Sequence, residues 1–534
     1  MSTVKKFVCD FCLNGCNLGV SFDGYQYRIE YLTDEPPNYG RLCPRGNSAN
    51  IVIDHPKRLC YPLLDGKEIT WQQALKTIQE WLDSSRSEEI AVVYSRGLTE
   101  AELGGVTDFA RHLGTENLVS GYLEPDNFLG YQLAGVRRAK LEEVLAARAI
   151  LLIGDVFSAS PVAARFLLDA RYAEKSSRLI VIDSIRTKQA GFAHLFLQVK
   201  PGTEYWALAG IAGLLDPKLK LDIERFAREC GVERSRMEEA AGILKSVGAG
   251  LVGAAFSFGR TGNPLLCSLF AQLVALKADK PFVGFAEALV PDGKLSFQDF
   301  WKKVSQGKIK LLFWFGGLFP YSYPEIFPDI NRVQFRVATS IFKAGQMLPG
   351  LVLPVPSEFE KPGRGETLWR RVDREPVAKP VSGAKLINEI IEGITGTSLR
   401  SGTESVRQRE QFQVSQVLEL LANQPETKPV SGYLLVGQRR AIGIGEFYGS
   451  EDDIIVNPKD ALELKVEDGA RLNVKTSNGQ VEFWVRVSGE VPAGVLAIGV
   501  DCHKNRVLFS VEFDRHSGIA TIPPTKVEVW RKQD

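Results

Sequence analysis

The chain has 534 residues, of which 44% are hydrophobic and 24% are charged, and its formal net charge is +1. This length predicts three or four domains that can each bury a core, and the composition excludes a largely disordered protein. The near-neutral charge gives no electrostatic reason to expect nucleic acid or an anionic membrane as a partner. The most apolar runs, near 249–258 and 311–319, are too short and too rich in glycine to span a bilayer.

Four of the eight cysteines lie within the first fifty residues, in the pattern C-x2-C-x3-C-x26-C: Cys9, Cys12, Cys16 and Cys43. Three thiolates on one tight loop and a fourth from a following hairpin make a four-thiolate ligand set, which suits an iron–sulfur cluster or a structural zinc ion. Three ligands on one loop favour a [4Fe–4S] cube, because a four-thiolate zinc site more often uses two C-x2-C pairs. Zinc stays open as the alternative.

The N-terminus shows no apolar signal-peptide core, and its cysteine ligands begin at once, so we expect a cytoplasmic protein. The remaining cysteines lie far apart in the sequence, and we expect free thiols in a reducing compartment: Cys60, Cys230, Cys267 and Cys502. A second cluster in this chain is therefore not expected.

Short alternating stretches at 18–24 and 25–32 follow the ligand loop, with Asp23-Gly24 as a turn between them. They predict a small antiparallel sheet. From about Glu89, continuous apolar runs alternate with helical patterns, which is typical of doubly wound parallel sheets. We expect strands at 90–94, 149–153, 178–182, 250–255, 310–315 and 333–337, and helices at 72–84, 99–112, 162–172 and 264–275.

The segments 149–161 and 310–324 occupy equivalent positions in this pattern, so we expect two related α/β units. Residues 425–431 then form a polar bridge that contains proline, and beyond it the helical patterns largely vanish. Short strands at 433–436, 471–476, 481–487 and 495–498 alternate with glycine-containing turns. This spacing predicts a small closed β-barrel at the C-terminal end.

In this order, the parts resemble the molybdopterin oxidoreductase superfamily over essentially the whole chain. The resemblance also rests on shorter motifs: Cys43-Pro-Arg-Gly, Gly154-Asp155 with Pro161, Asp183-Ser-Ile-Arg186-Thr187, Lys200-Pro-Gly202-Thr203-Glu204, Leu353-Pro354 with Glu358 and Gly365-Glu366-Thr367, and Asn457-Pro-Lys-Asp460-Ala461. It implies an α/β fold with a [4Fe–4S] domain at 1–60, two interleaved doubly wound domains at 61–424, and a six-stranded barrel-like dinucleotide-binding domain at 432–534.

Within the superfamily, the chain looks most like the catalytic subunit of formylmethanofuran dehydrogenase with the dinucleotide-binding domain of that enzyme fused to its C-terminal end. Formate dehydrogenases and the cluster-bearing subunit of respiratory complex I are also similar. The resemblance implies a [4Fe–4S] cluster and a molybdenum or tungsten molybdopterin guanine dinucleotide as cofactors.

Several candidate binding residues lie just past strand ends, where open α/β sheets bind ligands: Gly154, Asp183, Gly316 and Gly317. Asp183 there could accept hydrogen bonds from a guanine amine or a ribose hydroxyl. By resemblance, further residues would contact the dinucleotide: Asp155, Arg186, Thr187, Gly202, Thr203, Asn457 and Asp460. The structural alternative is that the strand-end residues form ordinary turns and that Asn457 caps a helix.

Arg45 follows the fourth cysteine by two places. In the family a basic residue here lies between cluster and pterin, where its charge would stabilise the reduced cluster. The alternative is a surface arginine in a turn.

The sequence departs from the family in the loop at 119–129, where catalytic members carry a metal ligand. This loop contains no cysteine and no histidine. Glu124 or Asp126 could supply an oxygen ligand instead, and the alternative is that both are solvent-exposed carboxylates.

Two function classes follow. The chain is either an oxidoreductase that acts at a bis-pterin metal centre on formate or a formyl group, or an electron-transfer and scaffold subunit with a cluster but no active metal site. A third class is a non-redox, hydrolytic relative of the superfamily. The cysteine set argues against it, because a hydrolytic protein needs no iron–sulfur cluster. A single cluster implies a heteromeric complex with a ferredoxin-like, flavin-bearing or heterodisulfide-reductase-like subunit near Cys9–Cys16.

Overall fold

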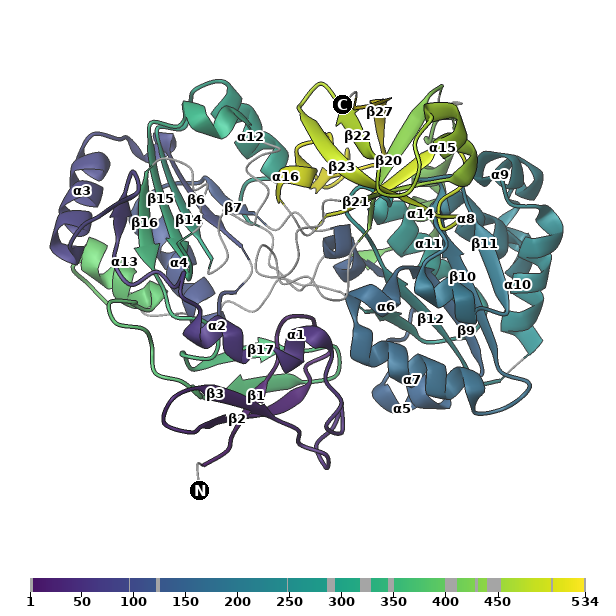
Figure 1. Ribbon diagram of the computed structural model, residues 1–534, viewed down its shortest axis with the longest axis horizontal. Coiled ribbons are helices and arrows are strands. Elements are labelled where there is room, and N and C mark those ends of the chain that lie inside the picture. Colours follow the sequence, from purple (N-terminus) through teal and green to yellow (C-terminus); the bar gives the residue numbers. More distant parts are fainter. Residues whose placement is uncertain are drawn as a thin grey trace.

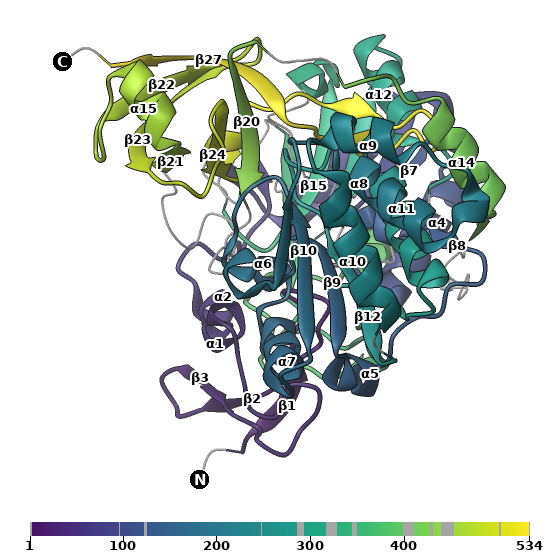
Figure 2. The same ribbon diagram turned by 90° about the vertical axis from the view of Figure 1, so that its right-hand side faces the viewer.

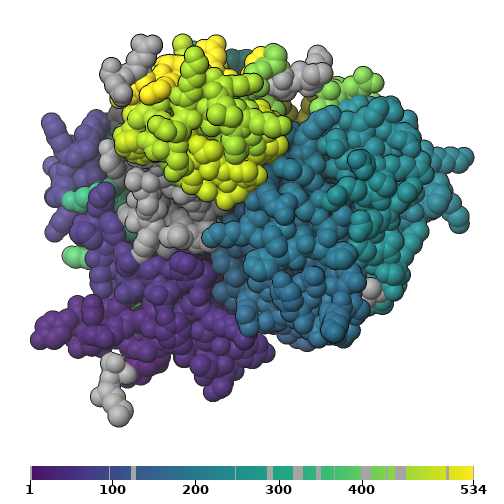
Figure 3. Space-filling view, turned by 45° about the vertical axis from the view of Figure 1, so that its right-hand side comes forward, coloured from purple at the N-terminus to yellow at the C-terminus, as the bar shows by residue number. Residues whose placement is uncertain are grey.

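The structure is a computed structural model that describes residues 3–95, 97–121, 125–246, 248–285, 293–316, 328–343, 350–398, 411–427, 431–438, 453–500 and 503–532. Figure 1 shows two α/β units side by side, with the N-terminal segment below them and a barrel above. The space-filling view in Figure 3 places the N-terminal segment, one α/β unit and the barrel together on one face. The predicted mixed α/β class is therefore confirmed.

The N-terminal segment forms a three-stranded antiparallel sheet followed by two short helices. Asp23 Oδ1 accepts hydrogen bonds from the N–H groups of Tyr25 and Gln26, both at 2.9 Å, and so closes the turn that the sequence predicts. The elements are β1 (Lys5–Val8), β2 (Asn17–Phe22), β3 (Tyr27–Glu30), α1 (Pro44–Asn47) and α2 (Asn50–Asp54).

A seven-stranded sheet is built from two stretches of chain that are far apart in sequence. Five of its strands are parallel, and β4 and β5 add an antiparallel edge. In spatial order the strands are β5 (Lys67–Glu68), β4 (Leu63–Leu64), β16 (Leu351–Pro354), β15 (Phe335–Ser340), β14 (Leu311–Phe315), β6 (Ile90–Tyr94) and β7 (Leu118–Ser120).

Helices cover both faces of this sheet. Successive residues of a strand point to opposite faces, so a continuous apolar strand presents apolar side chains to both. Phe313 packs edge-on against Phe109 of α4, with 5.1 Å between ring centroids, whereas Trp314 belongs to the core that contains Phe300 of α12. The helices are α3 (Trp71–Asp83), α4 (Glu100–His112) and α13 (Ile387–Thr395) on one face and α12 (Phe297–Ser305) on the other.

The sequence between these two stretches forms a five-stranded sheet that is parallel throughout. Its spatial order is β11 (Leu195–Gln198), β10 (Arg178–Asp183), β9 (Ala149–Gly154), β12 (Gly250–Ala255) and β13 (Phe282–Gly284). Its helices are α5 (Leu141–Ala146) and α7 (Pro161–Tyr172) on one face and α8 (Glu204–Leu215), α10 (Arg234–Ser246) and α11 (Pro264–Lys277) on the other, with α9 (Ile223–Cys230) packed on α8.

A closed six-stranded barrel forms the C-terminal region, as the sequence predicts. Figure 2 shows it at the top of the molecule, above the five-stranded sheet. The strands, in order around the barrel, are β20 (Tyr433–Gln438), β24 (Val495–Gly499), β21 (Asp453–Val456), β23 (Gln480–Val487), β22 (Arg471–Lys475) and β27 (Thr525–Arg531), and α15 (Pro458–Leu464) follows β21.

The barrel is joined to the loop that follows β12 by backbone hydrogen bonds. Gly259 donates to the carbonyl of Ile522 at 2.9 Å, and Gly437 donates to the carbonyl of Gly259 at 3.1 Å. Smaller elements complete the fold: α6 (Val156–Ala159), α14 (Val414–Ala422), α16 (His503–Arg506), β8 (Gln132–Leu133), β19 (Gln411–Phe412), β17 (Gly363–Glu366), β18 (Arg371–Arg374), β25 (Glu512–Phe513) and β26 (Ala520–Thr521). Within the described ranges, no helix has the length and apolar character that a membrane span requires.

Arg58 ties the N-terminal segment to the seven-stranded sheet. Its guanidinium pairs with Glu360 and donates to the carbonyls of Val52, Ile53 and Ile341, and both partners of the ion pair are almost fully buried. A buried carboxylate that loses its partner keeps the full cost of desolvation.

We expect Arg58→Met to lower the free energy of unfolding by about 3–5 kcal/mol, measured by urea denaturation. Arg28→Met is the matched control, because Arg28 forms an ion pair with Asp23 on the surface of the same segment and is 60% exposed. It should cost less than about 1 kcal/mol. Equal losses in the two variants would contradict the structural role of Arg58.

Candidate functional site

Three of the four N-terminal cysteines lie on one closed loop. The N–H of Cys9 donates to the carbonyl of Cys16 at 2.8 Å, at the point where β1 and β2 meet, and Cys12 lies between them. Cys43 directly precedes α1. None of the described cysteines forms a disulfide. The local fold thus presents three thiols from a hairpin loop and a fourth from the start of a helix.

These thiols are close enough to influence one another electrostatically. Burial, with further contributions from Cys16 and Cys12, raises the pKa of the Cys9 thiol well above its usual value. Burial and Cys12 also raise the pKa of Cys16, with Cys43 adding to the effect. The Asn14 amide opposes it by donating to Cys16 Sγ at 3.0 Å. Ionising Cys9 and Cys16 therefore needs a compensating positive charge, which a metal cluster supplies.

The donor set fits an iron–sulfur cluster better than a zinc ion. Ligation by four cysteine thiolates holds a [4Fe–4S] cube. The three thiols on the hairpin loop and the fourth at the start of α1 supply this ligand set.

Arg45 lies in α1 and connects the cysteine loop to the five-stranded unit. Its Nη2 donates to the carbonyls of Ser158 and Ala159, at 3.0 and 3.1 Å, and only 7% of the residue is exposed. The alternative of a surface arginine is therefore wrong. The predicted contribution of Arg45 to cluster reduction stays a prediction.

The carboxyl end of β9 requires a glycine. Gly154 has φ +72°, and a Cβ there would lie 2.0 Å from the carbonyl oxygen of Ala255, which follows on the neighbouring strand. Asp155 is buried and caps α6, with its Oδ1 accepting from the N–H of Ser158 at 3.2 Å. The turn brings the backbone of two strands together at the sheet edge.

A buried charged group lies at the same edge. Asp183 ends β10 and is 3.4 Å from the guanidinium Nε of Arg260, which follows β12. Burial raises the pKa of Asp183 to about 6, with Asp155 adding to the rise and Arg260 opposing it. Burial also raises the pKa of Glu204, at the start of α8, to about 8. Two carboxyl groups and one guanidinium are thus buried together, and the contacts within the protein compensate their charges only in part.

Several buried polar atoms around this group have no hydrogen-bond partner in the parts of the chain that the structure describes. They include two acceptors, two charged donors and three hydroxyl groups that can act as either: Asp183 Oδ2, Glu204 Oε2, Arg260 Nη1, Arg45 Nε, Ser160 Oγ, Ser184 Oγ and Thr187 Oγ1. Buried polar groups are normally hydrogen-bonded, so this concentration is unusual. The edge is chemically suited to a ligand with its own donors and acceptors, such as a purine nucleotide.

The barrel closes over this edge at a glycine contact. Gly202 has φ +80°, and a Cβ there would lie 3.3 Å from Gly262 Cα and 3.5 Å from Pro524 of the barrel. Thr203 is buried, and its hydroxyl donates to the carbonyl of Lys200 at 2.7 Å. The backbone N–H of Arg186 donates to the carbonyl of Glu490 at 2.7 Å.

The side chains of the candidates in this region differ in exposure. Arg186 is exposed, with its guanidinium 5.6 Å from the ring centroid of Phe196, whereas Thr187 is buried. The structure therefore brings Thr187, but not the Arg186 side chain, among the buried groups.

In the barrel, the structural alternative describes what is observed. Asn457 caps α15, with its Oδ1 accepting from the N–H of Lys459 and its amide donating to the carbonyl of Val491. Asp460 accepts from the N–H of Gly494 at 2.7 Å, and burial raises its pKa. Cofactor binding by these two residues stays a prediction.

The remaining candidates lie at the seven-stranded sheet. Gly316 follows β14, and its N–H donates to the hydroxyl of Thr339 at 2.9 Å. Gly317 and Glu124 lie outside the described residues, and so does the side chain of Asp126. Their predicted roles remain predictions.

The sequence reasoning did not single out Arg260, although it is the base that faces both buried acids. One signal was present in the sequence, because Arg260 is a charged residue in the otherwise uncharged stretch that follows β12.

These features define the class: an α/β protein with a four-cysteine domain and a barrel that closes over a nucleotide-like site. Comparison with known families agrees. Residues 2–55 match the molybdopterin oxidoreductase Fe4S4 domain, and residues 436–522 match the molydopterin dinucleotide binding domain. The chain carries these two domains, and the predicted cofactors, a [4Fe–4S] cluster and molybdopterin guanine dinucleotide, are confirmed.

Similar proteins include the F420-dependent formate dehydrogenase subunit alpha of Methanocaldococcus jannaschii, which is 29% identical over 274 residues, covering 45% of this chain and 40% of that one. The NADPH-Fe(3+) oxidoreductase subunit alpha of Geobacter sulfurreducens is 21% identical over 610 residues, covering 92% and 71%. The matched region thus spans less than half the length of the formate dehydrogenase subunit. The solved structure of acetylene hydratase from Pelobacter acetylenicus shares the fold, with a TM-score of 0.75 and 15% identity over 99% of this chain and 100% of that one.

The burial of Glu204 predicts a pH-dependent stability. Because the folded state raises the pKa of this acid to about 8, its contribution to stability is fully present below the unfolded pKa and is lost as the pH rises through about 8. In the cofactor-free protein at about pH 8, Glu204→Gln should therefore be more stable than the wild type, by on the order of 3 kcal/mol.

Urea denaturation at about pH 5 and about pH 8 checks this expectation. The gain should disappear at the lower pH. Glu224→Gln is the control, because the Glu224 side chain is 61% exposed in its ion pair with Arg234 and should show no such gain. A Glu204→Gln gain of the same size at both values would contradict the titration of Glu204.

Proposed function

We propose that this chain is a redox subunit of the molybdopterin oxidoreductase family. In this proposal the four N-terminal cysteines hold a [4Fe–4S] cluster, and a molybdenum or tungsten bis-pterin guanine dinucleotide lies between the two α/β units under the barrel. The observation that carries the proposal is the set of buried polar atoms at the edge of the five-stranded sheet that have no hydrogen-bond partner among the described residues. Arg45 links this edge to the cysteine loop.

Different residues of the chain would bind different parts of the dinucleotide. Asp183 and Glu204 would accept hydrogen bonds from the N–H groups of a guanine edge, and Arg260 would donate to its carbonyl oxygen. Gly154 and Gly202 would let the backbone approach the phosphates, because no Cβ stands in the way. When bound, the metal–pterin group supplies two-electron oxidation and reduction of a small substrate, and the cluster transfers single electrons.

Formate is the substrate class that the relatives favour, because three of those found are named F420-dependent formate dehydrogenase subunits alpha. A formyl group, as in formylmethanofuran dehydrogenase, stays a prediction from sequence. Glu124 or Asp126 would supply the oxygen ligand that replaces the missing cysteine. The alternative function, a relay and scaffold without an active metal site, is favoured by the absence of cysteine from residues 119–129.

The proposed domain boundaries are 1–60, 61–424 and 432–534. We further propose a cytoplasmic heteromeric complex, because the four N-terminal cysteines are the sole set with cluster spacing in the sequence, and electrons from one cluster need a second carrier. A ferredoxin-like, flavin-bearing or heterodisulfide-reductase-like subunit near the cysteine loop would serve.

Metal analysis of the anaerobically purified protein, combined with pterin extraction, tests the proposal. We expect about four irons per chain together with pterin and molybdenum or tungsten. Iron without pterin would support the relay, and zinc without iron would contradict both functions.

Ligand variants test the cysteine assignment separately. Cys12→Ser should lose most of the bound iron, because three thiolates hold a cube less firmly than four. Cys60→Ser is the matched control, because Cys60 is also partly buried but lies outside the ligand pattern, and it should keep the wild-type iron content. Equal iron content in both variants would overturn the assignment.

A further inference from the structure

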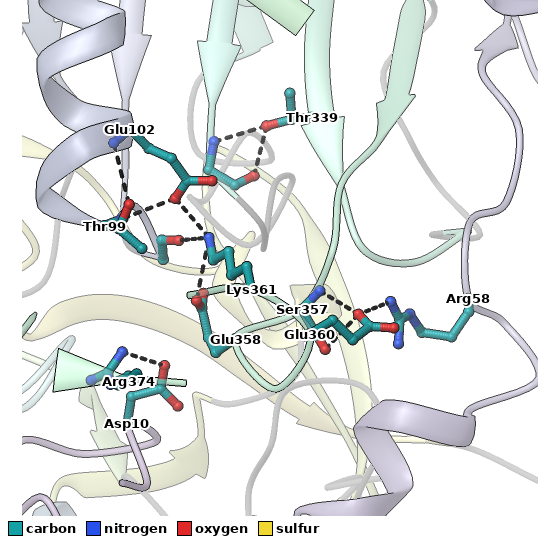
Figure 4. Close-up of polar contacts among 12 residues, drawn as sticks. Asp10, Arg58, Thr99, Glu102, Thr339, Ser357, Glu358, Glu360, Lys361 and Arg374 are labelled. Carbon is teal, nitrogen blue, oxygen red and sulfur yellow. Dashed lines mark hydrogen bonds and ion pairs between the residues drawn. The ribbon is translucent and has the colours of Figure 1, made fainter. Parts of the chain in front are cut away.

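Five charged side chains meet between the cysteine loop and the seven-stranded sheet (Figure 4). We call them the Lys361 cluster: Asp10, Glu102, Glu358, Lys361 and Arg374. They come from four different places in the chain, namely the ligand loop, the start of α4, the turn at 357–361 and β18. Neither the proposed catalysis nor the dinucleotide site uses this group.

Lys361 is the centre of the cluster and is 3% exposed. Its ammonium donates to the carbonyl of Gly97 at 2.7 Å and to Glu102 Oε2 at 2.8 Å, and it lies 3.3 Å from Glu358 Oε2. Glu102 is also fixed by accepting from the N–H of Thr99 at 2.9 Å. Of the three partners, Glu358 is held by the longest contact.

The Lys361 cluster connects the ligand loop with the carboxyl edge of the seven-stranded sheet. Asp10 directly follows the ligand Cys9, and its carboxylate is 3.4 Å from Arg374. Gly97 and Thr99 follow β6, at the carboxyl edge of the seven-stranded sheet. Next to Glu358, Phe359 stacks on Phe7 of β1 with 4.3 Å between ring centroids, so the turn is anchored beside the loop.

The charges of the Lys361 cluster do not balance. Asp10, Glu102 and Glu358 give three negative charges, whereas Lys361 and Arg374 give two positive charges. Glu358 is 22% exposed, so its carboxylate has access to solvent protons, whereas the Glu102 side chain is 5% exposed. Burial raises the pKa of Glu358 to about 7, with Asp10 and Glu102 reinforcing the rise and Lys361 and Arg374 opposing it.

We propose that Glu358 takes up one proton from water when the iron–sulfur cluster gains one electron, and releases that proton when the cluster is oxidised. This inference rests on the proposed function, because it requires the cluster on the four cysteines. In the step, the reductant gives one electron to the cluster, and one O–H bond forms on the Glu358 carboxylate. The proton comes from a hydronium ion of the solvent, in which one O–H bond breaks, and the charge of the region stays constant.

The physical reason is electrostatic coupling inside a poorly solvated region. An added electron places another negative charge near a group that already carries one uncompensated negative charge, which favours the protonated form of a partly exposed acid such as Glu358, whose contact with Lys361 is long. Glu360, in the same turn, does not qualify, because its carboxylate is paired with Arg58 and hydrogen-bonded to Ser357.

A mediated redox titration of the cluster in the full chain, read by EPR with dithionite as reductant, tests the proposal. The reduction potential should fall with rising pH by about 59 mV per pH unit over the pH range in which Glu358 is ionised in the oxidised chain and protonated in the reduced chain, which is a tenfold change in the reduction equilibrium per unit. In Glu358→Gln this dependence should vanish. Glu35→Gln is the control. It removes a partly exposed carboxylate that is paired with Lys6 in the N-terminal segment, and it should keep the pH dependence of the potential.

Infrared difference spectra of the wild-type chain give a second measurement that does not depend on any variant. A protonated carboxyl band should emerge on reduction, and it should shift in D2O. A potential that is independent of pH from about pH 6 to about pH 9, an unchanged slope in Glu358→Gln, or no carboxyl band would each overturn the proposal. A chain without an EPR-active cluster would instead refute the proposed function.

Discussion

The structure depends on charged and polar groups that are removed from water and only partly compensated by the protein itself. Asp183, Glu204 and Arg260 share one buried edge, and three thiols on one loop face a fourth at the start of α1. Burying such groups costs several kcal/mol unless partners complete them. A bound dinucleotide and a bound cluster would supply those partners, so the stability of the chain and its cofactor content are linked.

Close backbone approach is the second constraint, and it serves the first. Gly154 against Ala255 and Gly262 against Gly202 leave no room for a Cβ, so the loops after β9, β12 and β11 converge on the same edge. The barrel then covers this edge through the backbone contacts of Gly259. Because the partners in each contact are far apart in sequence, the site exists only when both the sheet and the barrel are in place.

The same separation explains what the sequence could predict. Residues 250–255 form a strand with the predicted bounds, because a continuous apolar run between glycines leaves few alternatives. The thiol loop was predicted because its three ligands are local. Barrel strands β21 and β27 were not predicted: Asp453–Val456 is a short run of four residues, and Thr525–Arg531 alternates with charged residues. Arg260 was missed because its partner Asp183 lies on another strand, which a single sequence does not reveal.

Two charged side chains of different character flank the cysteine loop. Arg45 is held by two backbone carbonyls, so its guanidinium is fixed in position, where it would stabilise the reduced cluster. Glu358 belongs to the Lys361 cluster, which has one negative charge more than it has positive charges. Its contact with Lys361 is long and its side chain is partly exposed, so its charge responds to pH. A fixed cation raises the reduction potential of the cluster by a constant amount, whereas a carboxylate that titrates makes the reduction potential depend on pH. In this arrangement, electron transfer through the loop would be coupled to protons without any change in the fold.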